Sequence, residues 1–363
     1  MRNVKWGNFK LGDLFDIDNT LSFNSDVFVE GNEYDYVTRT SYNQGVLQST
    51  GFVNSENINP AGTWSLGLLQ MDFFYRPKCW YAGQFVRKIT PKINIPQGVI
   101  LFFSTILNMQ KQILLSVLVR NVDKTFRSIE VYLPVVADGQ IDFEFMESFV
   151  EELEAERVAE LTAYLKVSGL DNYALSKEEY QVLDEFKNGS VSFKDYSFSE
   201  IFNNIKQGRR LKKDDQLPGN IPFVMSGTTN TGVVNHISNP VASFPDNSIT
   251  IDIFGNAFYR NYSFGAGDDT GVYWNDEKHY SKEAMLFFTT VMEKALFGKY
   301  SYGKKLRSSK SYDFKMKLPK ADDGNPDYKT MELLISAVQK LVIKDVVQYA
   351  DEKIAATKTV INK

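Results

Sequence analysis

The chain contains the stretch YVTRTSYNQGV at residues 36–46, which returns as FVMSGTTNTGV at residues 223–233. The second copy begins 187 positions after the first, since 223 minus 36 is 187. The stretch LFFST at residues 101–105 likewise returns as LFFTT at residues 286–290, which is 185 positions later. Solenoid units repeat every ~20 to 50 residues, so this much longer period indicates a duplicated domain. Two similar but diverged modules are expected to recognise two related but different things.

The composition is that of a soluble globular protein. At 363 residues the chain is long enough for two domains of roughly 100 to 200 residues each. No run approaches the ~18 apolar residues that a membrane span needs, and the start of the chain lacks a basic-then-apolar signal segment. Cys79 is the single cysteine, which excludes an intramolecular disulfide. Together these features predict a cytoplasmic protein.

The net charge of −4 argues against a nucleic-acid-binding protein until the distribution of charge is considered. Between Asp142 and Lys166 there are eight acidic and two basic residues, so the rest of the chain carries +2. The cations are clustered in residues 206–213 and 299–310. Because DNA affinity depends on local neutralisation of phosphates, these clusters keep a DNA-binding function open.

Each half is expected to contain short strands and turns followed by a long helix. Residues 248–260 predict a β-hairpin around Gly255-Asn256. Ser281 is a plausible N-cap for the helix that follows, and the equivalent first-half segment, residues 101–112, should also be helical. Residues 168–190 form the predicted connector between the halves.

Two segments, residues 143–166 and 331–357, place apolar residues at helical spacing and predict helices of roughly 35 to 40 Å. Each apolar stripe must be covered, either by the core of its own domain or by the other helix. The recurrence of the stripe in both halves favours a helix pair. The stripes include Met146, Val150 and Leu153 in the first half and Ile335, Val338 and Val342 in the second.

Several motifs occur in order along the chain: FKLGDLFDI at residues 9–17, IPFV at 221–224, KYSYGKK at 299–305, and, in both halves, a Leu-Pro, Asp-Gly, Asp-aromatic, Met-Glu run before the long helix. With them the chain resembles the DNA specificity (S) subunits of type I restriction-modification systems, and of related type II systems with a separate S chain. The resemblance implies an α+β fold in which two repeated target-recognition domains are separated by two long antiparallel helices with pseudo-two-fold symmetry. The expected limits are 1–141 and 188–326 for the recognition domains, 142–187 for the first helix with its connector, and 327–363 for the second helix.

The resemblance further implies that the chain binds an asymmetric bipartite site in double-stranded DNA and directs partner methyltransferase and endonuclease subunits to it. The expected partners are DNA methyltransferase subunits, two per chain, with a restriction subunit as a further candidate. The resemblance implies that the methyltransferase subunits dock on the long helices, and the residues expected to bind them are Met146, Val150, Leu153, Ile335, Val338 and Val342. S-adenosylmethionine and Mg²⁺ would be bound in the partners and not in this chain.

Candidate DNA-binding residues are cations for phosphates and polar side chains for base edges. The segment of the first half equivalent to residues 299–307 reads SVLVRNVDK at residues 116–124 and lacks the Tyr-Gly-Lys signature, which puts contacts there in doubt. The candidates are Arg39, Thr40, Asn43, Gln44, Arg120 and Lys124 in the first half, and Arg209, Arg210, Lys212, Lys213, Thr228, Thr229, Asn230, Lys299, Tyr300, Tyr302, Lys304, Lys305 and Arg307 in the second.

Catalytic motifs are sparse. There is no Pro-Pro pair for an adenine methyltransferase motif, and His236, His279 and Cys79 are too few for a zinc site or a His-based triad. The sequence therefore predicts a non-catalytic protein. A Mg²⁺-dependent nuclease is the enzyme alternative, because Asp246 with the run Asp276-Glu277-Lys278 loosely imitates a metal-binding constellation. A pure assembly scaffold is a third possibility.

Overall fold

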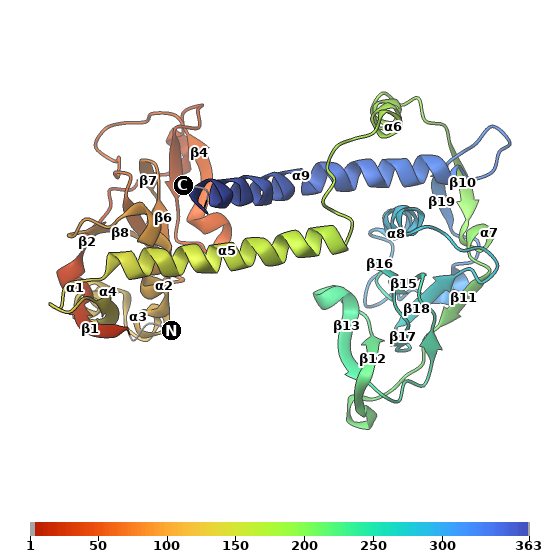
Figure 1. The fold of residues 1–363 in the computed structure, drawn as a ribbon. Helices are drawn as coiled ribbons and strands as arrows, with labels where there is room; N and C mark the ends of the chain where they lie inside the picture. Colours follow the sequence, from red (N-terminus) through yellow and green to blue (C-terminus); the bar gives the residue numbers. More distant parts are fainter. Residues whose placement is uncertain (1–3, 362–363) are drawn as a thin grey trace. The chain divides into compact units, whose positions relative to one another are not determined.

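The computed structural model describes residues 4–361 and divides into two compact units, Met1–Glu160 with Thr357–Lys363, and Leu161–Ala356 (Figure 1). Each unit has a mixed α/β fold, and the second unit repeats most of the order of elements in the first. The duplication that the sequence predicts is therefore present in the fold.

The first unit contains three small sheets. The four-stranded sheet has the order β2-β8-β5-β6 and is antiparallel throughout. The three-stranded sheet has the order β4-β3-β7, and its β3–β7 pair is parallel. Strands β1 and β9 form an antiparallel pair that brings the start of the unit against its end. The strands are β1 (Lys5–Lys10), β2 (Phe15–Asn19), β3 (Tyr34–Val37), β4 (Val46–Thr50), β5 (Thr63–Gly67), β6 (Phe73–Arg76), β7 (Trp80–Ala82), β8 (Val86–Pro91) and β9 (Glu130–Val135).

The second unit repeats these sheets with one added strand. Its four-stranded sheets have the orders β11-β18-β15-β16 and β13-β12-β17-β14, and β10 pairs with β19. The pair β12–β17 is parallel, as β3–β7 is in the first unit. The strands are β10 (Phe193–Ser197), β11 (Asn204–Gln207), β12 (Pro218–Val224), β13 (Val233–Ile237), β14 (Ser243–Phe244), β15 (Ser248–Asp252), β16 (Ala257–Arg260), β17 (Phe264–Ala266), β18 (Thr270–Trp274) and β19 (Lys315–Pro319).

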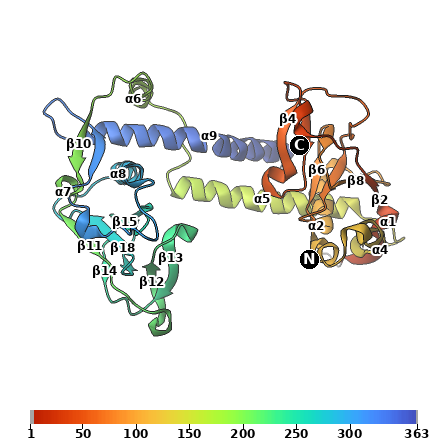
Figure 2. The same ribbon diagram turned by 180° about the vertical axis from the view of Figure 1, so that it is seen from behind.

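A helix covers one face of the larger antiparallel sheet in each unit. In the second unit α8 (Lys282–Leu296) lies against β15 and β16, as both views show (Figures 1 and 2). Ile249 and Ile251, two residues apart on β15, point to the same face and are buried in one cluster with Met285 and Phe288 of the helix. In the first unit α2 (Ile100–Met109) has the corresponding place, with Phe103 buried in one cluster with Trp64 of β5.

The local predictions from capping and turn residues are confirmed. β15 and β16 form the predicted hairpin, with Gly255 at a φ of 97° in the turn. The Ser281 side chain accepts a hydrogen bond from the backbone N–H of Ala284 at 3.2 Å and caps α8. The predicted helix at residues 101–112 is present as α2 and α3 (Lys111–Leu115), with a break at Gln110.

The expectation that no segment approaches a membrane span is wrong for Gln97–Leu115. By length and composition alone this segment could cross a membrane, with a mean hydropathy of 1.3. Packing explains its apolar composition, because Phe103, Leu107 and Leu114 are fully buried in the core of the first unit. Leu101 and Ile113 remain exposed, so the segment also carries unburied apolar surface.

The predicted connector contains a helix that the sequence analysis missed. The helix α6 (Lys177–Lys187) begins with a capping box, in which the Ser176 side chain accepts from the N–H of Glu179 and the Glu179 carboxylate accepts from the N–H of Ser176. The same carboxylate accepts hydrogen bonds from Ser336 at 2.6 Å and from the Lys340 ammonium at 2.8 Å. Glu179 therefore fastens α6 to α9 (Tyr328–Ile361).

Replacing Glu179 by Gln is expected to lower the free energy of unfolding of the second unit by about 2 kcal/mol at pH 7, because Lys340 loses its ion pair. Burial raises the pKa of Glu179, but hydrogen bonds from Lys340, Ser336 and the Ser176 N–H outweigh it and lower the pKa to about 2, from 4.5. A lowered pKa stabilises the fold fully above pH 4.5, and this stabilisation is lost as the pH falls towards 2. Denaturant unfolding at pH 7 and at pH 3 should therefore show a difference between wild type and variant that shrinks at the lower pH. The exposed Glu178→Gln is the matched control, and an equal loss in both variants would contradict the assignment.

The two long helices are α5 (Phe143–Val167) and α9. Within the second unit, Leu165 of α5 is buried with Val347 and Ala350 of α9. The end of the first helix thus contacts the second helix. Pairing along their whole lengths, and the pseudo-two-fold symmetry, stay predictions.

Candidate nucleic-acid interface

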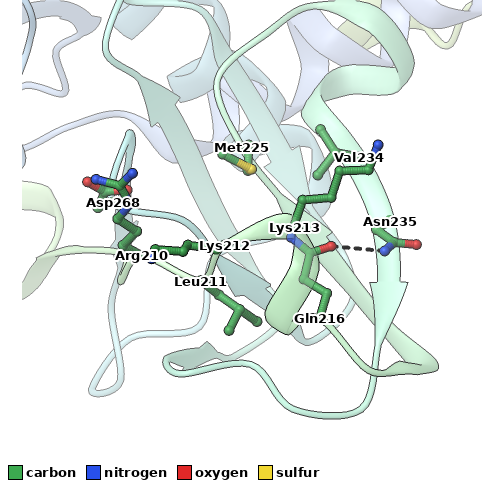
Figure 3. A pocket seen from close by; sticks show the side chains of 9 residues that line it. All are labelled: Arg210, Leu211, Lys212, Lys213, Gln216, Met225, Val234, Asn235 and Asp268. Carbon is green, nitrogen blue, oxygen red and sulfur yellow. Dashed lines mark hydrogen bonds between the residues drawn. The ribbon is translucent and has the colours of Figure 1, made fainter.

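A cationic groove lies on the second unit. We call it groove 2, and its volume is about 670 Å³ (Figure 3). Of the predicted phosphate-binding residues, Arg210, Lys212 and Lys213 line it and are exposed. Gln216 and Asn235 face each other in it, with the Asn235 carboxamide donating to the Gln216 side-chain oxygen at 2.9 Å. The lining residues are Arg210, Leu211, Lys212, Lys213, Gln216, Met225, Val234, Asn235 and Asp268.

Gly208 lets the basic segment that follows it lie close to the edge of β17. Gly208 sits so near to β17 that a Cβ on it would lie 2.3 Å from the carbonyl oxygen of Gly267 and 2.5 Å from that of Ala266. The next residue, Arg209, donates its backbone N–H to the Ala266 carbonyl at 2.9 Å. This close approach requires glycine and places the basic residues that follow along groove 2.

The second basic cluster has a partly structural role. The Arg307 guanidinium donates to the carbonyl oxygen of Asp268 at 2.6 Å and so helps to hold the rim of groove 2. Tyr300 packs against the core, with the Lys304 ammonium 5.9 Å from its ring centroid. Tyr302 is exposed, with the Lys305 ammonium 4.6 Å from its ring centroid. Lys299 is exposed as well.

The first unit has a groove at the equivalent position. We call it groove 1, and its volume is about 390 Å³. Thr38 in groove 1 corresponds to Met225 in groove 2 at an offset of 187, and Gln84 corresponds to Asp268 at an offset of 184. The lining residues are Tyr36, Thr38, Arg39, Thr40, Leu69, Gln70, Gly83 and Gln84.

The two grooves differ in chemistry. Groove 1 contains a single lining cation, Arg39, whose guanidinium carbon lies 5.2 Å from the Phe85 ring centroid. Two carboxamides, Gln70 and Gln84, lie exposed in the same groove. The sequence predicted Arg39 and Thr40 but neither glutamine, because the lining comes from three separate segments, residues 36–40, 69–70 and 83–84.

The predicted asparagines lie in turns beside the grooves. Asn43 and Gln44 have φ angles of 46° and 52°, and Asn230 and Thr231 have 47° and 51°. The Asn43 carboxamide donates to the Val46 carbonyl at 3.1 Å, and the Asn230 carboxamide makes the equivalent bond. The left-handed backbone and this bond give a structural reason for asparagine here, whereas base contacts by these residues stay predictions.

The remaining candidates lie around these features. Thr228 and Thr229 are exposed in the second turn. The doubtful first-half segment, residues 116–124, leads into a helix, α4 (Val122–Ser128), that the second unit lacks. Arg120 and Lys124 are exposed there and line neither groove.

One predicted partner-binding residue must be corrected. Met146 is fully buried in the core of the first unit, so it has no surface to offer a partner. Its repeat counterpart, Met331, is buried in the same way. The first turn of each long helix therefore packs on its own domain, which was the alternative explanation of the stripe.

Further along α5 the stripe faces an open apolar groove of about 190 Å³. Val150 and Leu153, both predicted to bind a partner, lie in it, and we call it the apolar groove. Ile335 and Val338 are the repeat counterparts of these two residues at an offset of 185, and Val342 is exposed one turn beyond. The lining residues are Leu101, Phe102, Thr105, Ile106, Phe149, Val150, Leu153 and Glu154.

The nuclease alternative finds no support. Within residues 4–361 no group of three or more His, Cys, Asp or Glu side chains is placed to hold a metal ion. Asp276, which that alternative needs as a ligand, instead accepts a hydrogen bond from the Asn203 carboxamide at 2.6 Å.

Comparison with known proteins identifies the family. Residues 3–163 and 190–349 each match the family model for the type I restriction modification DNA specificity domain. The chain belongs to this family. It is a non-catalytic specificity subunit of a restriction-modification system, and recognition of a DNA sequence is implied by the family.

Two relatives extend the match over nearly the whole chain. The chain is 24% identical over 347 residues to the type II restriction enzyme BgcI specificity subunit S.BcgI of Heyndrickxia coagulans, covering 94% of this chain and 96% of the relative. The crystal structure of the type I restriction-modification system S subunit from M. genitalium matches with a TM-score of 0.62 and 14% identity, covering 99% of this chain and 95% of that one. The second comparison shows a shared fold.

Proposed function

We propose that this subunit reads an asymmetric, two-part site in double-stranded DNA, one part with each half of the chain. The observation that carries the proposal is the pair of grooves at equivalent positions of the repeat, lined by unlike side chains. The cations of groove 2 suit phosphates, and the carboxamides in both grooves suit base edges. Because the linings differ, the two half-sites should differ in sequence.

The long helices would set the distance between the half-sites. The 25 residues of α5 correspond to roughly 38 Å at 1.5 Å per residue. One turn of B-DNA is about 34 Å, so half-sites read from the same face of the duplex would lie about one turn apart. The length of the helices would then fix the number of unread base pairs between the half-sites.

Methyl transfer and cleavage would be carried out by partner subunits in the cytoplasm. We expect adenine methyltransferase subunits, two per chain, together with a restriction activity, and we expect S-adenosylmethionine and Mg²⁺ to be bound there. The apolar groove and its repeat counterpart at Ile335 and Val338 are the proposed docking sites. Leu153 in the apolar groove and Val338 in its counterpart are exposed apolar residues, so each site offers a methyltransferase subunit an apolar contact.

The experiment that tests the function is base-resolution mapping of methylated DNA bases in the source cells, with and without this gene. Loss of methylation at one gapped motif with two unlike parts, restored by the gene on a plasmid, is the expected result. An unchanged methylation pattern, in cells shown to express the partner methyltransferase, would overturn the proposal.

Charged substitutions at the proposed docking sites should show how many methyltransferase subunits bind the chain. Leu153→Glu and Val338→Glu each place a carboxylate on one proposed docking site, and burying an unpaired charge is costly. Each single variant should retain about half of the copurified methyltransferase, and the double variant almost none. Leu118→Glu, on an exposed apolar residue outside the apolar groove, is the control. Full retention in the double variant would exclude docking at these sites.

A further inference from the structure

Each unit buries an arginine side chain at the same place. Arg76, at the end of β6, is 3% exposed, and Arg260, at the end of β16, is fully buried. Burial lowers the pKa of Arg76 to about 10 and also lowers the pKa of Arg260. Neither guanidinium forms an ion pair with a carboxylate in the described part of the chain. An unpaired buried cation is costly, and its occurrence in both halves calls for a reason.

The hydrogen bonds of the two arginines are also repeated. Arg76 Nε donates to the Ser65 hydroxyl at 2.9 Å, and its Nη2 donates to the carbonyl oxygen of Gln44 at 2.5 Å. Arg260 Nε donates to the Thr250 hydroxyl at 3.0 Å, and its Nη2 donates to the carbonyl oxygen of Thr231. In each case the guanidinium joins a hydroxyl of the sheet to a backbone carbonyl of an exposed turn.

These turns are the ones with the left-handed residues. Gln44 and Thr231 are each the second of two consecutive non-glycine residues with positive φ. Such residues are strained unless the surrounding structure holds them, and they cluster at binding sites. The turn in the first unit is strongly exposed, with Tyr42 at 86%.

The turns are joined directly to the grooves. The N–H of Thr38, in groove 1, donates to the Gly45 carbonyl at 2.7 Å, and the N–H of Met225, in groove 2, donates to the Gly232 carbonyl at 2.9 Å. Each turn is therefore part of the wall beside its groove. The two turns share a backbone conformation, but their exposed residues differ, with Tyr42 in one copy and Thr229 in the other.

We propose that Arg76 and Arg260 are positioning residues that hold these two turns in the conformation that reads DNA bases, each for its own half-site. The inference rests on the proposed function, since it assigns a role within DNA recognition. Discrimination between bases needs donors and acceptors placed to within about 0.5 Å. A rigid anchor from the sheet meets that need, and the turn residues supply the contacts.

The test replaces each arginine by lysine in the whole complex and maps methylated bases in cells. Lysine keeps the charge but cannot span the sheet hydroxyl and the turn carbonyl with a planar fork. Arg76→Lys should relax base preference about tenfold or more in one half-site and leave the other half-site strict. Arg260→Lys should do the reverse.

Affinity for unrelated DNA, and its dependence on salt, should stay as in wild type because the charge is retained. The exposed Arg157→Lys is the control.

A merely structural role would lower the melting temperature of both variants without relaxing either half-site, and that result would overturn the inference. Equal weakening of both half-sites would overturn it as well. If Arg76→Lys abolishes methylation through misfolding, the milder Ser65→Ala decides, since it removes the sheet hydroxyl that orients the guanidinium. Relaxation of one half-site by Ser65→Ala supports the inference, and strict half-sites overturn it. Failure of the wild-type chain to restore any gapped motif would instead refute the proposed function.

Discussion

A chain carrying Lys212→Glu together with Lys213→Glu is expected to lose DNA affinity by roughly a hundredfold at low salt. Both side chains are exposed and line groove 2, where they would neutralise phosphates. Each neutralised phosphate contributes about 0.9 to the slope of log affinity against log salt, so the slope should fall by about 2. Titration of the purified complex with its target duplex at several salt concentrations measures both quantities.

The matched control is Lys177→Glu together with Lys187→Glu. These exposed lysines lie at the two ends of α6, in the same unit, and line neither groove. The control changes the net charge of the complex by the same amount. Equal weakening by both double variants would mean that overall charge, and not groove 2, governs DNA affinity.

Local signals predicted local structure well. Gly255-Asn256 predicted the hairpin of β15 and β16, and Ser281 predicted the start of α8, because both depend on neighbouring residues only. The helix α6 was missed although its signal is present, since Ser176 and Glu179 have the spacing of a capping box. The segment predicted only as a connector therefore contains a helix that the sequence does specify.

The site was less predictable because it depends on tertiary structure. The periodicity of the α5 stripe cannot tell which of its residues faces the domain core, so Met146 and Leu153 were treated alike although one is buried and the other lines the apolar groove. Gln84 and Gln216 line grooves whose other walls come from distant segments. The buried arginines could have been found, since Arg76 and Arg260 stand at matching places in the repeat.

Replacing residues 192–326 by a copy of residues 4–141 is expected to change the methylated motif completely. Both modules would then carry groove 1, so both half-sites should have the same sequence. Their relative orientation reports the symmetry of the assembly. Modules related by a two-fold axis read opposite strands and give a palindrome, whereas modules related by translation give a direct repeat.

The reciprocal chain, with residues 192–326 copied in place of residues 4–141, should produce a second motif built from the other half-site. Base-resolution methylation mapping of cells carrying either chain checks the result. The two new motifs together should contain the two parts of the wild-type motif and nothing else, because each module is expected to read DNA independently. If either chain still methylated the wild-type motif, the modules would not be the units of recognition. A palindrome from both chains would establish the pseudo-two-fold arrangement that the repeat predicts.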